Sequence, residues 1–294
     1  VDIRYHIYSL AAVFMALAVG IVIGTSFARG SPPADAGRKT ILRYESDMRR
    51  LKTEIQKASR SAQEHEAVAR ASQDFCRALM PIVIKDKLAW RPVAIVQTGD
   101  SDEVTGSVKQ ALEMAGANVS SVTEISRDFP FDDPARTAQA LLDSGIRPEN
   151  TGKQDRDRLF GVIAETIQSG RYAEVLSKLE AAGVATFTGD YFKFNKLVVI
   201  VGGAADDGSG TAEVVDTNLI AQFEKLGVRA VGCEGSGAEI SYVPAWHKMG
   251  IATVDNADSA LGQIAMIYAL NGETARFGFK ETAERVIPQS LESR

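Results

Sequence analysis

Hydrophobic and polar positions divide the chain into three parts, and the first is apolar. Residues 7 to 27 run IYSLAAVFMALAVGIVIGTSF without a charge. As a helix this run would be about 31 Å long, which matches the apolar thickness of a lipid bilayer. The pattern therefore predicts a transmembrane anchor. A cleaved signal peptide is the alternative, because Ser26-Phe27-Ala28 resembles a processing site, but the run is longer than the apolar part of a normal signal.

Two features of this run bear on how it would sit and pack in a membrane. Tyr5 and Tyr8 lie at its N-terminal end, where aromatic rings with a polar group favour the membrane interface. Ala16, Gly20 and Gly24 recur every four residues and form a small-residue face that a second helix could approach closely. Arg4 lies on the N-terminal side of the run and Arg29, Arg38 and Lys39 on the other, so the positive-inside count does not favour an N-terminus inside the cell.

The second part is a helical pattern with a seven-residue repeat. It follows Gly30-Ser31-Pro32-Pro33, which breaks the helix, so residues 30 to 37 are a predicted linker. Two apolar rows then run through residues 38 to 80. Their strongest members are the predicted dimer contacts, Ile41, Tyr44, Met48, Leu51 and Ile55. A parallel two-stranded coiled-coil stalk is predicted, and a long helix folded back on its own head is the alternative.

The third part, residues 81 to 294, alternates short apolar runs with helical patterns. Pro81 is expected to end the stalk. Strands are predicted at 93–96, 118–122, 184–188, 197–201, 228–231 and 251–254. Helices are predicted at 102–115, 135–142, 156–169, 173–181, 214–226 and 259–270. This order favours an α/β fold in which a Rossmann-like parallel sheet is covered on both faces. The domains are thus a 1–29 anchor, a 30–37 linker, a 38–80 stalk and an 81–294 head.

Composition and charge exclude several classes. Hydrophobic residues make up 45% of the 294 residues, so the chain can bury a sizeable core, and the mean hydropathy of -0.07 excludes a protein with many membrane spans. Residues 38 to 77 carry ten Lys/Arg and six Asp/Glu, a net charge of +4, and the charges of residues 1 to 37 balance. Because the whole chain has a net charge of -5, the remaining residues, which form the head, carry about -9. This argues against nucleic acid as a partner. Two cysteines allow neither a disulfide scaffold nor a four-cysteine zinc site.

Catalytic candidates are few. The segment Gly202–Gly210 follows a strand and precedes a helix, the usual place for a phosphate, but it matches no nucleotide motif and its Asp206 and Asp207 would repel an anion. We interpret it as a flexible surface loop. Cys233 and His247 could form a nucleophile and base with Glu234 as orienter, yet the spacing of a nucleophile elbow is missing. No enzyme activity and no cofactor are therefore predicted.

Metal ligands are equally scattered. Copper(I) prefers thiolate and thioether ligands in close clusters, and the sequence has no CxxC or MxxM. The soft candidates outside the anchor and the apolar rows are Cys76, Met80, Met114, Cys233, Met249 and Met266. Only His247 and Met249 are close in sequence, and two ligands give weak binding. No metal site is predicted.

Both ends of the chain carry a family resemblance. Arg4-Tyr5-His6, Ser9 to Phe14 and Ala16 to Gly20 resemble the opening of the MctB family of bacterial envelope proteins. Near the C-terminus, Phe277-Gly278-Phe279-Lys280 and Ile287-Pro288 look like the closing segment of that family, with Phe277 where a Tyr is common. The resemblance covers essentially the whole chain, and in the middle it is carried by pattern alone.

What the resemblance implies is divided. One view of the family is copper transport or an outer-membrane channel, and another is a single-pass membrane protein that dimerises through its stalk and controls peptidoglycan hydrolysis. A channel disagrees with the residues, because one helix encloses no pore and the head strands are continuous rather than alternating. We therefore expect a homodimeric envelope scaffold in the cell membrane with stalk and head outside the cytoplasm. Its expected partner is an envelope protein such as a cell-wall hydrolase or its regulator. Copper homeostasis is the alternative, and an α/β enzyme or a nucleotide-binding head is the second alternative.

Overall fold

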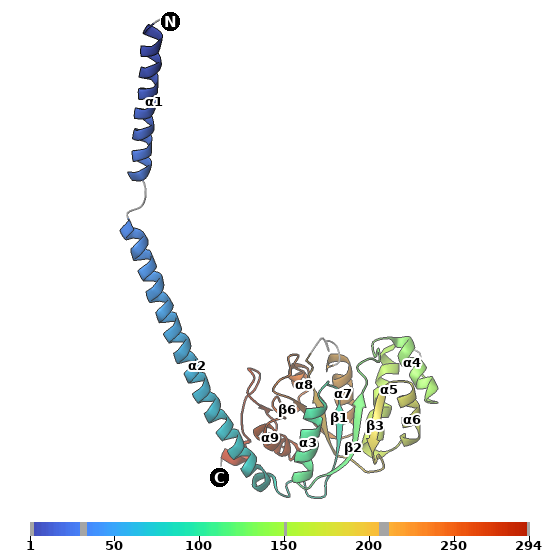
Figure 1. Ribbon diagram of the computed structural model, residues 1–294. Coiled ribbons are helices and arrows are strands. Elements are labelled where there is room, and N and C mark those ends of the chain that lie inside the picture. The colour runs from blue at the N-terminus through green and yellow to red at the C-terminus, as the bar shows by residue number, and fades with distance from the viewer. Residues whose placement is uncertain (1–2, 30–33, 150–151, 206–211, 293–294) are drawn as a thin grey trace. The chain divides into compact units, whose positions relative to one another are not determined.

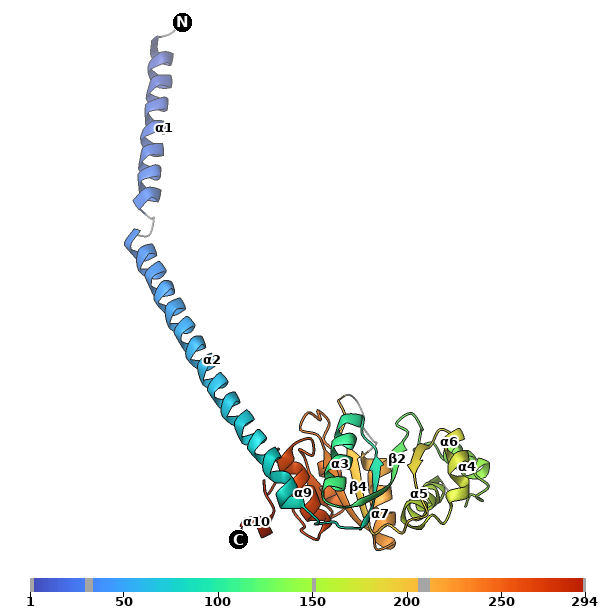
Figure 2. The ribbon, with the colours of Figure 1, turned by 60° about the horizontal axis from the view of Figure 1, so that its bottom comes forward.

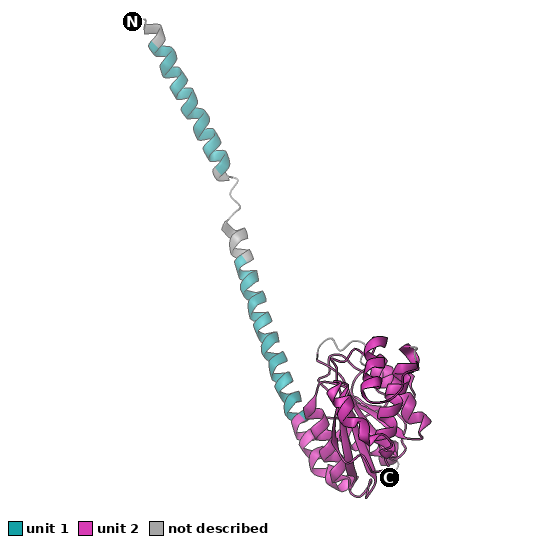
Figure 3. Ribbon diagram, turned by 90° about the vertical axis from the view of Figure 1, so that its right-hand side faces the viewer, with its two compact units in different colours: residues 1–69 teal, residues 70–294 magenta. Residues whose placement is uncertain are grey.

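The structure is a computed structural model that describes residues 3–29, 34–149, 152–205 and 212–292. It divides into two compact units, residues 1–69 and residues 70–294, coloured separately in Figure 3. Helix α2 belongs to both units, because it runs from Ala34 to Ile84. We describe each unit by itself.

The first unit contains α1, Ile3–Arg29, and the larger part of α2. Within α1, residues His6–Phe27 are long and apolar enough to cross a membrane, with a mean hydropathy of 2.4 and no burial inside the protein. Among the described residues this is the one helix that qualifies. A membrane span at the predicted position thus agrees with the structure, whereas a single-pass topology and the side on which the head lies stay predictions.

Helix α2 differs from its prediction at both ends. It begins at Ala34, so the second half of the predicted linker is helical, and residues 30–33 lie outside the described part of the chain. At the other end α2 continues through Pro81 to Ile84, so the expectation that Pro81 ends the stalk is wrong. Proline removes one helical hydrogen bond. Burial of Met80 and Ile84 in the head core offsets that loss.

The second unit is built on a seven-stranded sheet with the order β3-β2-β1-β4-β5-β6-β7 (Figure 1). The strands are β1 Pro92–Gln97, β2 Asn118–Ile125, β3 Ala185–Gly189, β4 Leu197–Gly202, β5 Arg229–Glu234, β6 Ala252–Val254 and β7 Arg276–Phe277. All neighbours are parallel except β2 and β3, which are antiparallel. The mixed α/β head with a mostly parallel sheet is confirmed, and the Rossmann-like assignment and the coiled coil stay predictions.

Helices cover both faces of this sheet (Figures 1 and 2). They are α3 Asp102–Met114, α4 Pro134–Asp143, α5 Gly152–Ser169, α6 Leu176–Ala181, α7 Thr217–Lys225, α8 Val243–Lys248, α9 Ala260–Leu270 and α10 Gln289–Glu292, with a 3-10 turn at Ala173–Val175 and a π-helical turn at Ala212–Asp216. Side-chain caps start several of them: Ser101 caps α3, Asp133 caps α4 and Ser259 caps α9. The sequence did not predict α8, α10, β7 or the π-helical turn.

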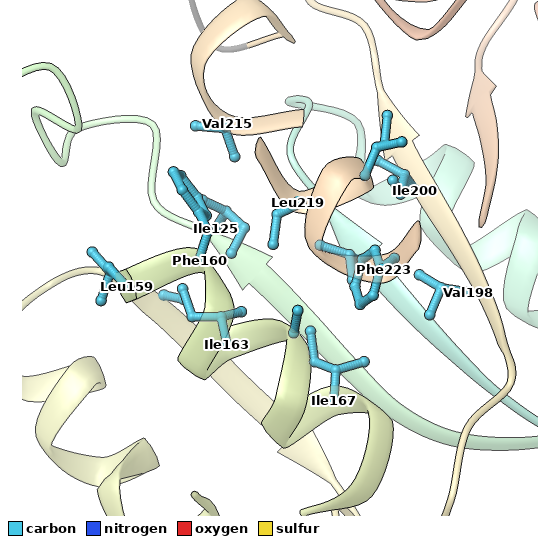
Figure 4. Close-up of a cluster of buried hydrophobic side chains, with 14 of the residues drawn as sticks. Ile125, Leu159, Phe160, Ile163, Ile167, Val198, Ile200, Val215, Leu219 and Phe223 are labelled. Carbon is cyan, nitrogen blue, oxygen red and sulfur yellow. The ribbon is translucent and has the colours of Figure 1, made fainter. Parts of the chain in front are cut away.

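Two hydrophobic cores lie on opposite faces of the sheet. One joins α4, α5, α7 and α8 to the sheet, and Figure 4 shows its centre, where Phe160 and Ile163 of α5 gather with Leu219 and Phe223 of α7. The other joins α3, α9 and the end of α2 to the sheet. Strand β4 is buried along its whole length, because alternate residues point into each core.

Candidate functional site

The main candidate site is a cleft at the carboxyl edge of the sheet, with a volume of about 460 Å³. Residues after four parallel strands line it: Asp100 follows β1, Gly203 follows β4, Ala238 follows β5 and Asp258 follows β6. After β1 the chain continues to α3 on one face of the sheet, and after β4 it continues to α7 on the opposite face. Ligands of open α/β sheets bind in crevices where neighbouring strands diverge in this way.

The backbones of the loops after β1 and β4 approach closely at the base of the cleft. A Cβ atom on Gly99 would lie 2.3 Å from the carbonyl oxygen of Gly203. Gly203 itself has a φ of 88°, a conformation that glycine adopts without strain. The nitrogen atoms of Thr98 and Gly99 both donate to the carbonyl oxygen of Val201, at 2.8 and 3.1 Å. The base of the cleft is therefore rigid.

Acidic side chains dominate the lining. Asp100 Oδ2 accepts a hydrogen bond from the nitrogen of Ala205 at 2.8 Å and lies 3.5 Å from Arg127 Nη1. Asp258 accepts from both the nitrogen and the hydroxyl of Ser236, at 2.9 and 2.6 Å. Glu103 adds an exposed carboxylate from the first turn of α3. This lining disfavours a phosphate or another anion, although a helix begins at the cleft.

An ion pair between a buried glutamate and a partly exposed lysine lies next to the cleft. Glu234 ends β5 with no exposed side-chain surface, and its Oε1 accepts from Lys280 Nζ at 2.6 Å. The other carboxylate oxygen, Oε2, accepts from the nitrogen of Tyr242 at 2.8 Å. Lys280 also donates to the carbonyl oxygen of Ala238, in the cleft wall. The role of orienter for a catalytic thiol is thus wrong for Glu234, because its carboxylate binds Lys280, Ser241 and Tyr242.

The C-terminal motif that carries the family resemblance is held by two acids. Asp255, which follows β6, accepts hydrogen bonds from the nitrogens of Phe279 and Lys280, both at 2.9 Å. Glu234 holds the ammonium group of the same lysine. The motif therefore ties the end of the chain to β5 and β6 and so positions one wall of the cleft.

Asp216 is a second buried acid near this edge. Its Oδ2 accepts from Trp246 Nε1 at 2.6 Å, and its Oδ1 has no hydrogen-bond partner in the described part of the protein. Burial raises the pKa of Asp216 to about 7, against the opposing effect of the hydrogen bond from Trp246. The side chain is therefore largely protonated below neutral pH.

The structure does not bring Cys233 and His247 together. The thiol of Cys233 is buried in the core of α3 and α9, whereas His247 is exposed on α8, which packs on the other face of the sheet. Burial raises the pKa of Cys233, so the thiol carries little of the charge that a nucleophile or a copper ligand needs. The two residues cannot act as one catalytic pair in this fold.

The soft copper ligands are dispersed as well. Met80 and Met266 are buried in the core of α3 and α9, and Met249 packs against the other core. Cys76 is half-buried on α2, and Met114 is partly exposed on α3. In the described segments, no three His, Cys, Asp or Glu side chains are grouped closely enough to hold a metal ion. The pair His247 and Met249 has gained no further soft ligand from the fold.

The interpretation of Gly202–Gly210 as a flexible surface loop is wrong for the first three residues of this segment. Residues 202 to 204 are buried, because they pass between the loop after β1 and the side chains of α8. Asp206 and Asp207 lie outside the described residues. Sequence reasoning weighed this segment alone and so missed its partners, Asp100 and Asp258. The sequence signal that could have found them is an acidic residue shortly after β1 and another shortly after β6.

The predicted membrane and dimer residues are all on helices. The side chain of Tyr8 is exposed on α1, that of Tyr5 lies outside the described residues, and no neighbouring group approaches Gly20 or Gly24. The predicted dimer contacts on α2 are exposed in the single chain, from 53% for Leu51 to 69% for Tyr44; they are Ile41, Tyr44, Met48, Leu51 and Ile55. Their role in a dimer stays a prediction.

Comparison with known proteins gives one consistent result. The family model described as "Copper transport outer membrane protein, MctB" matches residues 1–288. The "Copper transporter MctB" of Mycobacterium tuberculosis is 26% identical over 298 residues, which cover 92% of both chains. The protein of the same name from Mycobacterium leprae is 25% identical over 326 residues, covering 98% of this chain and 100% of the relative. These matches favour the copper alternative over the scaffold hypothesis.

Proposed function

The chain belongs to the MctB family, and on that premise we propose that it acts in copper homeostasis of the cell envelope. The full-length match to proteins named copper transporters is the observation that carries this proposal. The chain would act as a single-pass membrane protein with stalk and head outside the cytoplasm. The span His6–Phe27 supports the anchor.

We propose further that copper is cargo handled by an assembly, and that this chain holds no resident copper. Its soft ligands are dispersed over the two cores and the surfaces of α2 and α3, and the thiol of Cys233 is buried. A single apolar helix also encloses no pore, so passage of an ion across the bilayer needs other helices. The head would supply binding surfaces, among them the acidic cleft, and no catalysis.

Two measurements test this function. Deletion of the gene should lower copper tolerance and raise cell-associated copper, and the full-length chain should restore both. Copper(I) titration of the purified full chain should show no tight stoichiometric binding. The variants His247→Ala and Met249→Leu should complement as well as the wild type, since these two residues form the closest potential ligand pair.

Each measurement has an outcome that contradicts the proposal. Unchanged copper tolerance and copper content in the deletion strain would reject the copper function. Tight stoichiometric copper binding that disappears in the His247 and Met249 variants would reject indirect handling and assign a resident site. A matched titration with zinc controls for unspecific binding of metal ions to surface carboxylates.

A scaffold that regulates peptidoglycan hydrolysis is the second candidate. The exposed apolar row on α2 favours it, because such a row is stabilised by a partner helix and suits a dimeric stalk. In this case deletion should change the activity of cell-wall hydrolases in the envelope without changing copper content. Measuring both quantities in one strain separates the two functions.

A further inference from the structure

Three exposed aromatic side chains lie in the two loops that enter β1 and β4 at the amino edge of the sheet, opposite the acidic cleft. Trp90 precedes β1 and is 91% exposed, the largest exposed fraction among the large apolar side chains of the described residues. Phe192 and Phe194 precede β4 and are 80% and 53% exposed. Single exposed apolar residues are ordinary, but three large rings at one edge need an explanation.

The register of the sheet places two of these rings at the same level. Val93 of β1 pairs with Leu197 of β4, and each follows its aromatic residue, Trp90 or Phe194, by three positions. Because neighbouring strands lie about 4.8 Å apart, the two segments leave the sheet side by side. Trp90 and Phe194 therefore both lie at the amino edge of these two central strands.

Both segments are fixed, so the rings are held outward. The nitrogen of Trp90 donates to the carbonyl oxygen of Gly116 at 2.9 Å. Asn195, which follows Phe194, is fully buried: its Nδ2 donates to the carbonyl oxygen of Ile167 at 2.6 Å and its Oδ1 accepts from Ser120 at 2.8 Å. The exposure of the rings is thus a property of the ordered fold.

The backbone at Trp90 shows that the fold does not require this residue. Its φ is 62°, in the left-handed region that glycine favours and that is a real outlier for a bulky side chain. A residue selected only for this turn would be glycine. A strained and fully exposed tryptophan points to a role at the surface.

The two segments that carry the rings contain more basic than acidic residues, although the head as a whole is acidic. The two segments 85–91 and 190–196 contain five basic residues, Lys85, Lys87, Arg91, Lys193 and Lys196, and two acidic ones, Asp86 and Asp190. Of the basic residues, Lys85, Lys193 and Lys196 are exposed, and Lys193 Nζ lies 3.7 Å from Asp190 Oδ2. The carboxyl edge has the opposite sign, with Asp100, Glu103 and Asp258 in its cleft.

We propose that this amino edge docks on an anionic phospholipid surface. The rings of Trp90, Phe192 and Phe194 would enter the interface, where aromatic side chains are favoured, while the lysines contact the headgroups. Charge complementarity selects an anionic surface. A broad lipid surface fits better than a peptide, because the rings stand on separate loops and none of them lines a described pocket.

The test uses the full chain held in a non-ionic amphipol, mixed with vesicles of phosphatidylcholine with or without phosphatidylglycerol. Trp90 is a built-in reporter, because the other tryptophan, Trp246, is fully buried. Anionic vesicles should shift the emission to shorter wavelengths and carry the chain upward in flotation, and neutral vesicles should do neither. The variant Trp90→Gly suits its backbone conformation, so it should fold normally; because it also removes the reporter, its binding is read from flotation alone, most of which should be lost.

Further variants distinguish binding through this surface from non-specific binding to vesicles. The double variant Lys85→Gln and Lys196→Gln should bind anionic vesicles about thirtyfold more weakly, since each basic residue near such a surface contributes about one factor of five. Phe279→Ala is the matched control: this ring is 63% exposed but lies after β7 at the other edge, so binding should not change.

Three results would overturn the proposal. The first is equal flotation with neutral and anionic vesicles, and the second is equal binding by Trp90→Gly and the wild type. The third is an emission shift with poly-glutamate but none with vesicles, which would assign the edge to an acidic protein instead.

Discussion

Replacing Asp216 by Asn should remove the pH dependence that this one carboxyl group gives to the stability of the head between pH 4 and pH 8. Asp216 is fully buried, and burial raises the pKa of its carboxyl group to about 7. In the unfolded chain the same group has its ordinary value of 3.8. Asparagine keeps an oxygen that accepts from Trp246 Nε1 and carries no charge at any pH.

The sign and size of the effect follow from these two pKa values. Because the folded state holds the proton more tightly, the stabilising contribution is complete below about pH 4 and is lost as the pH rises to about 7. The loss corresponds to roughly 4 kcal/mol, from about 1.4 kcal/mol for each pKa unit. Below about pH 4 the Asn variant should match the wild type, and at pH 8 it should be more stable by up to roughly 4 kcal/mol.

The assay is denaturant unfolding of the full chain in neutral detergent, followed by the fluorescence of the buried Trp246, at several pH values. Subtracting the free energy of unfolding of the wild type from that of the variant at each pH removes the contribution of groups that titrate in both proteins. Asp133→Asn is the matched control, because Asp133 is an exposed helix cap and both residues cap well. A constant difference between the Asp216 variant and the wild type from pH 4.5 to pH 8 would refute the reasoning.

Two further predictions address the cleft and the stalk. Lys280→Met should lower the free energy of unfolding by about 3 to 5 kcal/mol, because it leaves the carboxylate of Glu234 buried without its cation; the double variant with Glu234→Gln should recover part of this in the same unfolding assay. Leu51→Cys should form a disulfide-linked dimer in membranes, as the apolar rows of a parallel coiled coil face each other, whereas Arg50→Cys, one position away, should not. Equal crosslinking of both variants would contradict the dimer contacts.

The strands and helices of the head were largely predictable because most of them are local patterns. Val93–Val96 and Leu197–Val201 are apolar runs bounded by turn residues, and they became β1 and β4 with one residue more at their ends. The helix at 102–115 was predicted to within one residue, since Ser101 caps it and Gly116 follows it. In each case propensity, capping and burial favour the same structure.

Other features depend on contacts that no local pattern contains. The antiparallel β3 differs from a parallel strand only in its direction, which the connection through α5 and α6 decides. The helix passes Pro81 because Met80 and Ile84 become buried in the head. Helix α8 is short, and its place is determined by packing of Trp246 over Gly202 and Gly232.

The candidate site was missed for the same reason. Asp100, Gly203 and Asp258 are separated by more than fifty residues each, and only the sheet order brings them to one edge. The pair of Glu234 and Lys280 joins β5 to the C-terminal motif in the same way. The sequence did correctly suggest that Cys233 and His247 are isolated, and the two cores explain this by placing them on opposite faces.

The opposite charges of the two sheet edges have a partial explanation in helix dipoles. Helices of a parallel sheet begin at the carboxyl edge and end at the amino edge, so acids such as Asp102 and bases such as Lys85, just after α2, stabilise them in place. Lys193 and Lys196 follow a strand and not a helix, so this explanation does not reach them. It also gives no reason for a strained, exposed Trp90. The aromatic rings therefore carry the lipid inference, and for this reason the Trp90→Gly variant, which leaves every charge unchanged, is its decisive test.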